Sequence, residues 1–127
     1  MKIVINRCFG GFGLSTEAVA EYAKLKGLKH VRTQSRYLGD GYDLLTPNFD
    51  LPDVITDAQW NDEKNKIHSD RDIERSDQDL VLVVEKLGEK ANGHHTKLEV
   101  VEIPDGIEYT IEEYDGNEHV AEKHRTW

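Results

Sequence analysis

Three glycines within four residues are the part of this sequence whose spacing best suggests chemistry. Gly10, Gly11 and Gly13 follow an apolar run at residues 2–6 and precede a helical pattern that ends at Gly27. Glycines between a strand and a helix let the backbone approach a ligand and direct helix N–H groups at it, and phosphate is the natural ligand. The turn lacks the Gly-Lys-Ser/Thr of the Walker pattern and the glycine spacing of the dinucleotide fingerprint. Backbone geometry alone therefore predicts a phosphate site, and a plain strand-to-helix connection is the alternative.

Four side chains around this turn suit the same ligand. Ser15 is placed to cap the helix, and Arg7 could supply a positive charge to phosphate. Phe9 and Phe12 could offer a stacking face for a base, although the alternative places both rings in the core.

The C-terminal segment holds a cationic and aromatic cluster in an otherwise acidic half. Its members are His119, Lys123, His124, Arg125 and Trp127. If the last strand ran beside the first, this cluster could add guanidinium contacts to phosphate and an indole for stacking. The alternative is a basic tail over a sheet edge, with the tryptophan covering the core. The predicted ligand-binding residues are Arg7, Phe9, Gly10, Gly11, Phe12, Gly13, Ser15, His124, Arg125 and Trp127.

The cysteine and the histidines form no recognisable catalytic or metal-binding pattern. Cys8 sits at the end of the first strand, where a helix dipole could activate a thiol, but the spacing places neither His119 nor His124 beside it as a base. A buried, inert cysteine is the alternative. His94 and His95 are neighbours in a predicted loop and would point apart. We therefore predict no catalytic set, no metal site and no cofactor.

Charge excludes one class of partner and suggests another. The net charge is −9, and residues 64–127 carry 16 acidic and 9 basic residues. Wrapping of nucleic acid needs clustered Lys and Arg, so it is not expected. An acidic run near the C-terminus could instead imitate DNA phosphates and bind a host protein, with Glu112, Glu113 and Glu118 as the predicted contacts. A solvated sheet face explains the same residues.

The remaining pattern predicts an α+β fold. At 127 residues the chain suits a single domain over 1–127, with an irregular insert at about 39–75. Helices are expected from Ser15 to Gly27 and from a Ser76 cap to Asn92, and Asp115-Gly116 predicts a tight turn between two late strands. The expected order is β-α-β-insert-α-β-β-β, in a mixed or antiparallel sheet of about 4–5 strands with two helices on one face. No run is long enough for a membrane span, and a cytoplasmic protein is expected.

Three blocks of the chain resemble a known family. They are KIVINRCFGGFGLS at residues 2–15, LVLVVEKLGEKANG at 80–93 and VVEIPDGIEYTIEEYDGNEHVAEKHRTW at 100–127. Together they resemble a family of small uncharacterised proteins encoded by tailed phages and prophages, whereas residues 28–70 lie outside the resemblance. The resemblance implies a phage accessory protein acting in a bacterial cytoplasm. It carries over no catalytic or binding residue.

These observations lead to one main functional prediction and two alternatives. The main prediction is an accessory protein that sequesters a small phosphate-bearing ligand, such as a nucleotide or a nucleotide-derived signal of host defence. The first alternative is an acidic inhibitor of a host nucleic-acid-binding or defence protein. The second is a Cys8-dependent enzyme, although a non-catalytic role is preferred. The sequence leaves a homo-oligomer open.

Overall fold

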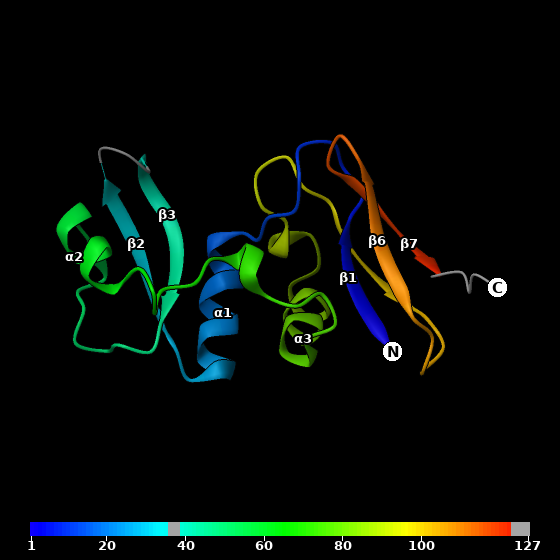
Figure 1. The fold of residues 1–127 in the computed structure, drawn as a ribbon, viewed down its shortest axis with the longest axis horizontal. Helices are drawn as coiled ribbons and strands as arrows, with labels where there is room; N and C mark the ends of the chain where they lie inside the picture. The colour runs from blue at the N-terminus through cyan, green and yellow to red at the C-terminus, as the bar shows by residue number, and fades with distance from the viewer. Residues whose placement is uncertain (36–38, 123–127) are drawn as a thin grey trace. The chain divides into compact units, whose positions relative to one another are not determined.

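The computed structural model describes residues 1–35 and 39–122, and within them it confirms an α+β protein (Figure 1). The elements in chain order are β1 (Lys2–Asn6), α1 (Thr16–Lys26), β2 (Lys29–Ser35), β3 (Gly39–Thr46), β4 (Val54–Ile55), α2 (Asp57–Glu63), a 3-10 helix (Asp70–Asp72), α3 (Gln78–Leu87), a second 3-10 helix (Gly88–Ala91), β5 (Leu98–Glu102), β6 (Tyr109–Tyr114) and β7 (Asn117–Glu122). No helix in these residues is long and apolar enough to cross a membrane.

The prediction of one sheet of 4–5 strands with two helices on it is wrong. The described residues form three α-helices and seven strands in three small sheets, ordered β1-β5, β3-β2-β4 and β6-β7. The predicted insert at 39–75 is also not irregular, since β3, β4, α2 and a 3-10 helix lie within it. Its strands escaped notice because β3 begins with Gly-Asp-Gly, residues that are depleted in strands, and β4 has only two residues.

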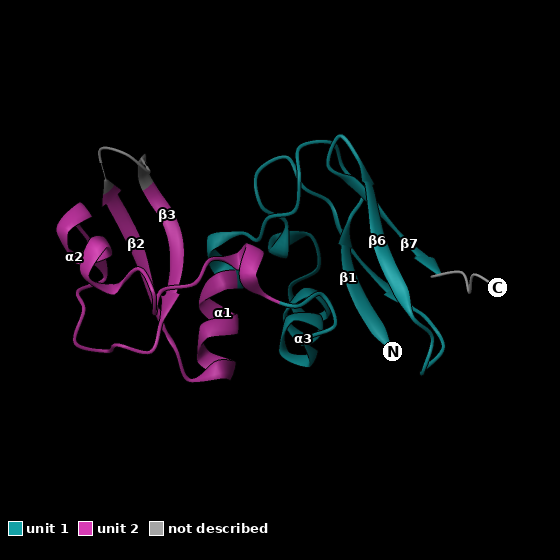
Figure 2. Ribbon diagram, viewed as in Figure 1, with its two compact units in different colours: residues 1–18, 74–127 teal, residues 19–73 magenta. Residues whose placement is uncertain are grey.

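The chain forms two compact units, shown in teal and magenta in Figure 2. Unit 1 comprises residues 1–18 and 74–127, and unit 2 comprises residues 19–73. Residues 2–15, 80–93 and 100–127 include all or part of β1, α3, β5, β6 and β7, all of which belong to unit 1.

Unit 1 is built on β1 and α3. Ile3, Val4 and Ile5 of β1 are fully buried, and α3 buries four apolar residues, namely Leu80, Val81, Val83 and Val84. The helix begins one residue later than predicted, because Asp77 rather than Ser76 accepts the N–H groups of Asp79 and Leu80.

Two antiparallel pairs complete unit 1. β1 pairs with β5, with Ile3 opposite Val101 and Asn6 opposite Leu98. β6 pairs with β7 through the predicted tight turn, where Asp115 and Gly116 have φ values of 49° and 87°. Positive φ at both central residues is the requirement of the two-residue turn that suits strand twist.

Unit 2 has a small core of its own. β2 pairs with β3 in antiparallel fashion and with β4 in parallel fashion. The buried residues are Val31, Leu44, Leu51, Ile55 and Ile67, with Trp60 packed against them. Thr56 and Gln59 form a capping box at the start of α2, which satisfies N–H groups that a helix start otherwise leaves unpaired.

Candidate functional site

The glycine turn that the sequence singles out is held by another loop of unit 1. The N–H of Gly93 donates to the carbonyl of Gly13 at 3.1 Å, and the hydroxyl of Thr96 donates to the same carbonyl at 3.2 Å. A Cβ atom at position 93 would lie 2.8 Å from the Gly13 carbonyl carbon, so only glycine fits there. The end of the turn is therefore packed against protein backbone.

The start of the turn is held by the β6–β7 connection. The N–H of Gly10 donates to the carbonyl of Asp115 at 3.1 Å. A Cβ atom at position 116 would lie 2.2 Å from the backbone nitrogen of Gly11. The close approach that the glycines permit is thus an approach to this chain's own turn.

The two predicted polar partners of phosphate are engaged within unit 1. Ser15 caps α1, since its Oγ accepts the N–H of Ala18 at 3.1 Å, and its own hydroxyl donates to the carbonyl of Lys90. Arg7 donates from Nε to Glu99 at 2.7 Å and from Nη1 to the carbonyl of Glu118 at 3.3 Å. The helix cap is confirmed, and the positive charge of Arg7 faces a carboxylate.

The two phenylalanines have different environments. Phe12 is buried, and the guanidinium carbon of Arg75 lies 3.6 Å from the centre of its ring. Phe9 is 56% exposed, and its ring centre lies 6.5 Å from that of Tyr114, with the planes at 79°. Tyr114 is 78% exposed. Only Phe9 is therefore open to a partner, together with a tyrosine that the sequence analysis did not select.

Part of the predicted site lies outside the described residues. His124, Arg125 and Trp127 are in the C-terminal segment beyond residue 122. Among the described residues, no group of three or more His, Cys, Asp or Glu side chains is placed to hold a metal ion.

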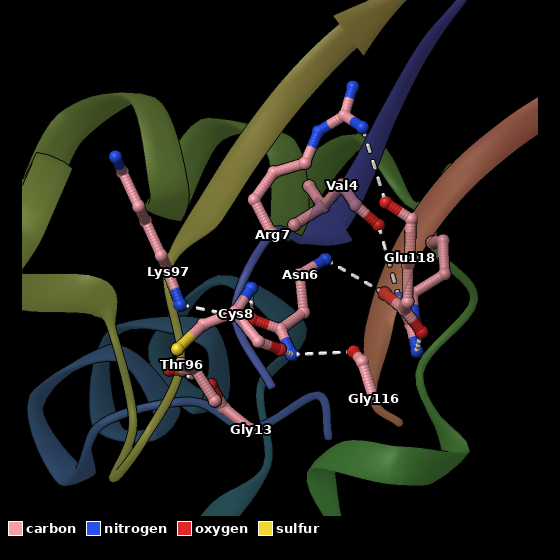
Figure 3. A network of polar contacts seen from close by, with 10 residues as sticks. Val4, Asn6, Arg7, Cys8, Gly13, Thr96, Lys97, Gly116 and Glu118 are labelled. Carbon is pink, nitrogen blue, oxygen red and sulfur yellow. Dashed lines mark hydrogen bonds and ion pairs between the residues drawn. The ribbon is translucent and has the colours of Figure 1, made fainter. Parts of the chain in front are cut away.

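The backbone of β1 ends in a polar network centred on Asn6, which is fully buried (Figure 3). Its Nδ2 donates to the carbonyls of Cys8 at 2.8 Å and Gly116 at 2.9 Å. Its Oδ1 accepts the N–H groups of Cys8 at 3.1 Å and Lys97 at 3.0 Å. One amide side chain therefore joins the glycine turn, β5 and the β6–β7 turn.

Glu118, which the sequence analysis assigned to an acidic surface, lies in the interior and is 4% exposed. Its Oε1 accepts the backbone N–H of Asn6 at 2.8 Å, a contact drawn in Figure 3. Arg75 donates to both carboxylate oxygens, at 2.6 Å and 2.8 Å. Such two-pronged contacts between a guanidinium and a carboxylate are strong and directional.

This ion pair covers the edge of β1 that does not face β5. The N–H of Val4 donates to the carbonyl of Arg75 at 2.8 Å, and Arg75 Nη1 donates to the carbonyl of Val4 at 3.4 Å. Together with the contact of Glu118 to Asn6, these bonds pair backbone groups of β1 that a neighbouring strand would otherwise pair. The predicted larger sheet is interrupted here for this reason.

A group of exposed acidic residues lies on the β6–β7 hairpin and just before it. Residues 107–122 contain six carboxylates and no Lys or Arg. Glu112 is exposed and contacts His119 across the strands at 3.0 Å, and Glu113 is exposed as well. Because side chains alternate along a strand, Glu112 shares its face with Tyr114. An acidic surface on this hairpin thus includes Glu112 and Glu113 but not Glu118.

Sequence reasoning overlooked Asn6, Arg75 and Tyr114. Asn6 had a visible signal, because a polar residue ending an apolar strand must find partners if buried. Arg75 and Tyr114 lie among charged neighbours, and nothing in their spacing separates them from those neighbours.

Comparison of the chain with protein-family models, curated proteins and solved structures gave no match.

Proposed function

We propose that this chain is a binding protein that recognises a basic protein partner. The observation that carries the proposal is the exposed ring pair of Phe9 and Tyr114, hereafter the aromatic pair, beside an acidic hairpin. Exposed aromatic residues are enriched where proteins bind one another, and Tyr is prominent among residues that dominate binding energy.

Charge selects the kind of partner. Five of the six carboxylates in residues 107–122 are exposed, the exception being the buried Glu118, and this segment has no Lys or Arg. Arg7, which contacts the hairpin, is paired with Glu99. Complementary charge steers association and disfavours partners of the same sign. In the setting that the sequence resemblance implies, the partner is a nucleic-acid-binding or defence protein in the host cytoplasm, and the chain acts as its inhibitor.

We expect the purified protein to capture a partner from host lysate in a salt-sensitive manner. Tyr114→Ala should reduce recovery about tenfold, because it removes one exposed ring of the pair. Tyr42→Ala is the matched control, since Tyr42 is also well exposed but belongs to unit 2. Recovery that is equal for the wild type and Tyr114→Ala would contradict the proposal.

A second candidate function is the binding of a small phosphate-bearing ligand by the glycine turn. Two observations favour it: the exposed Phe9 ring could stack on a base, and a Cβ atom at Gly11 would meet no atom within 4 Å. The hydrogen bonds of Arg7 to Glu99 and of Ser15 to the Lys90 carbonyl argue against phosphate binding, because a phosphate would have to compete with them.

Calorimetric titration with a panel of nucleotides and cyclic nucleotides tests this second function. Binding of one nucleotide, weakened about fivefold by Phe9→Ala through loss of base stacking, is the expected result. A Phe49→Ala variant controls for loss of an exposed phenylalanine elsewhere, because Phe49 lies in unit 2. Absence of heat at millimolar nucleotide would exclude the function.

A further inference from the structure

We propose that the aromatic pair, together with Glu112, binds an arginine side chain of the partner. This inference rests on the proposed protein-binding function and specifies the chemical group that is recognised.

The two rings stand on backbone that is fixed before any partner arrives. Asp115 next to Tyr114 has φ 49°, a value that residues other than glycine seldom adopt, and its carbonyl accepts the N–H of Gly10 next to Phe9. Asn6 also donates to the carbonyl of Gly116 at 2.9 Å. Because both loops are tied to each other and to the end of β1, little conformational freedom of the backbone is lost on binding.

The rings offer a surface suited to a planar cation. In their near-perpendicular arrangement, at 79° with centres 6.5 Å apart, the edge of one ring is turned toward the other ring, and both side chains remain more than half exposed. Aromatic faces attract guanidinium groups, which stack on them while keeping their N–H donors free. The chain already contains such a contact, since the Arg75 guanidinium lies over the Phe12 ring at 3.6 Å.

The neighbouring carboxylate completes the recognition of arginine. Glu112 is two residues before Tyr114 on β6, so both side chains leave the same face of the hairpin. Its carboxylate is 59% exposed and can accept N–H groups of a stacked guanidinium in addition to its contact with His119. An ammonium group lacks the planar stacking surface, so lysine should bind more weakly.

Titration with short peptides of defined composition tests the inference on the intact protein. The probes are three peptides of alternating glycine with arginine, lysine or citrulline, the last being a neutral side chain of nearly the same shape as arginine. We expect the arginine peptide to bind several-fold more tightly than the lysine peptide, and the citrulline peptide not to bind. Tyr114→Ala should weaken the arginine peptide about tenfold, and Tyr114→Phe should retain most of its affinity.

Two matched variants distinguish a specific role of the Glu112 carboxylate from the effect of the protein's overall negative charge. Glu112→Gln should weaken the arginine peptide several-fold, whereas Glu89→Gln, which removes an exposed charge outside the hairpin, should not. Circular dichroism of each variant verifies that it is folded. Equal binding of arginine and citrulline peptides, or equal binding by the wild type and Tyr114→Ala, would overturn the inference.

The outcome also distinguishes this inference from the function on which it rests. If lysate capture depends on Tyr114 but the arginine peptide shows no preference, the arginine inference fails and the binding function stands. If the arginine peptide binds through Tyr114 and no partner is captured, the recognition chemistry holds and the proposed function fails.

Discussion

Replacing Glu118 with alanine is expected to lower the free energy of unfolding by about 3–5 kcal/mol, the usual consequence of leaving one member of a buried ion pair alone. The Arg75 side chain is only 20% exposed and would lose both carboxylate contacts. The N–H of Asn6, which is fully buried, would lose its acceptor as well. Chemical denaturation monitored by circular dichroism measures this loss.

Two further variants identify the cause of the loss. Glu112→Ala removes an exposed carboxylate from the same hairpin and should change stability by no more than about 0.5 kcal/mol. Replacing both Arg75 and Glu118 with methionine should be less harmful than Glu118→Ala, because no charge is then buried without a partner. Amide exchange of Asn6 should accelerate in Glu118→Ala. A loss of under about 1 kcal/mol in that variant would show that the ion pair does not hold the edge of β1.

Gly116→Ala is the second substitution with a large expected effect. Its Cβ atom would lie 2.2 Å from the nitrogen of Gly11 and 2.7 Å from that of Gly10, which are backbone atoms that cannot rotate away. Strain at φ 87° adds about 1 kcal/mol, and separation of the two loops adds about 1–3 kcal/mol more.

Gly106→Ala is the matched control for this substitution. Gly106 has a similar φ of 81°, but a Cβ atom there would meet nothing within 4 Å. Its cost should therefore be limited to about 1 kcal/mol of backbone strain. The same denaturation measurement compares the two variants. Equal losses would mean that the glycine turn and the β6–β7 turn are not in the tight contact described above.

Local signals in the sequence correctly predicted α1, α3 and the β6–β7 turn. Gly27 has φ 68° and follows the last residue of α1, because glycine adopts at low cost the conformation that ends a helix. Asp115-Gly116 predicted the β6–β7 turn for the same reason, since this turn requires positive φ at both positions. The apolar spacing from Leu80 to Ala91 predicted a helix ending at Asn92, whereas α3 ends at Leu87 and a 3-10 helix follows at Gly88–Ala91. In each case, the residues that decide the conformation are close in sequence.

The sheet arrangement was not predictable in this way. The sequence indicated strands that could form one sheet, but the second edge of β1 is occupied by Arg75 and Glu118, which lie 43 positions apart. Strand propensity does not reveal which edge a side chain will cover, because that depends on contacts distant in sequence. The approach of the glycine turn to Gly116 is likewise a contact between segments distant in sequence.

The sequence by itself determined the fold class, the position of the glycine turn and the acidic character of the C-terminal half. Only the tertiary structure separated Glu118 from Glu112, and Phe12 from Phe9, although each pair consists of identical residue types in similar settings. Burial and partners decide the role of a carboxylate or a ring, and both are set by segments far away in the chain. The tertiary structure therefore placed one glutamate in the framework of unit 1 and left the other exposed on the hairpin that carries Tyr114.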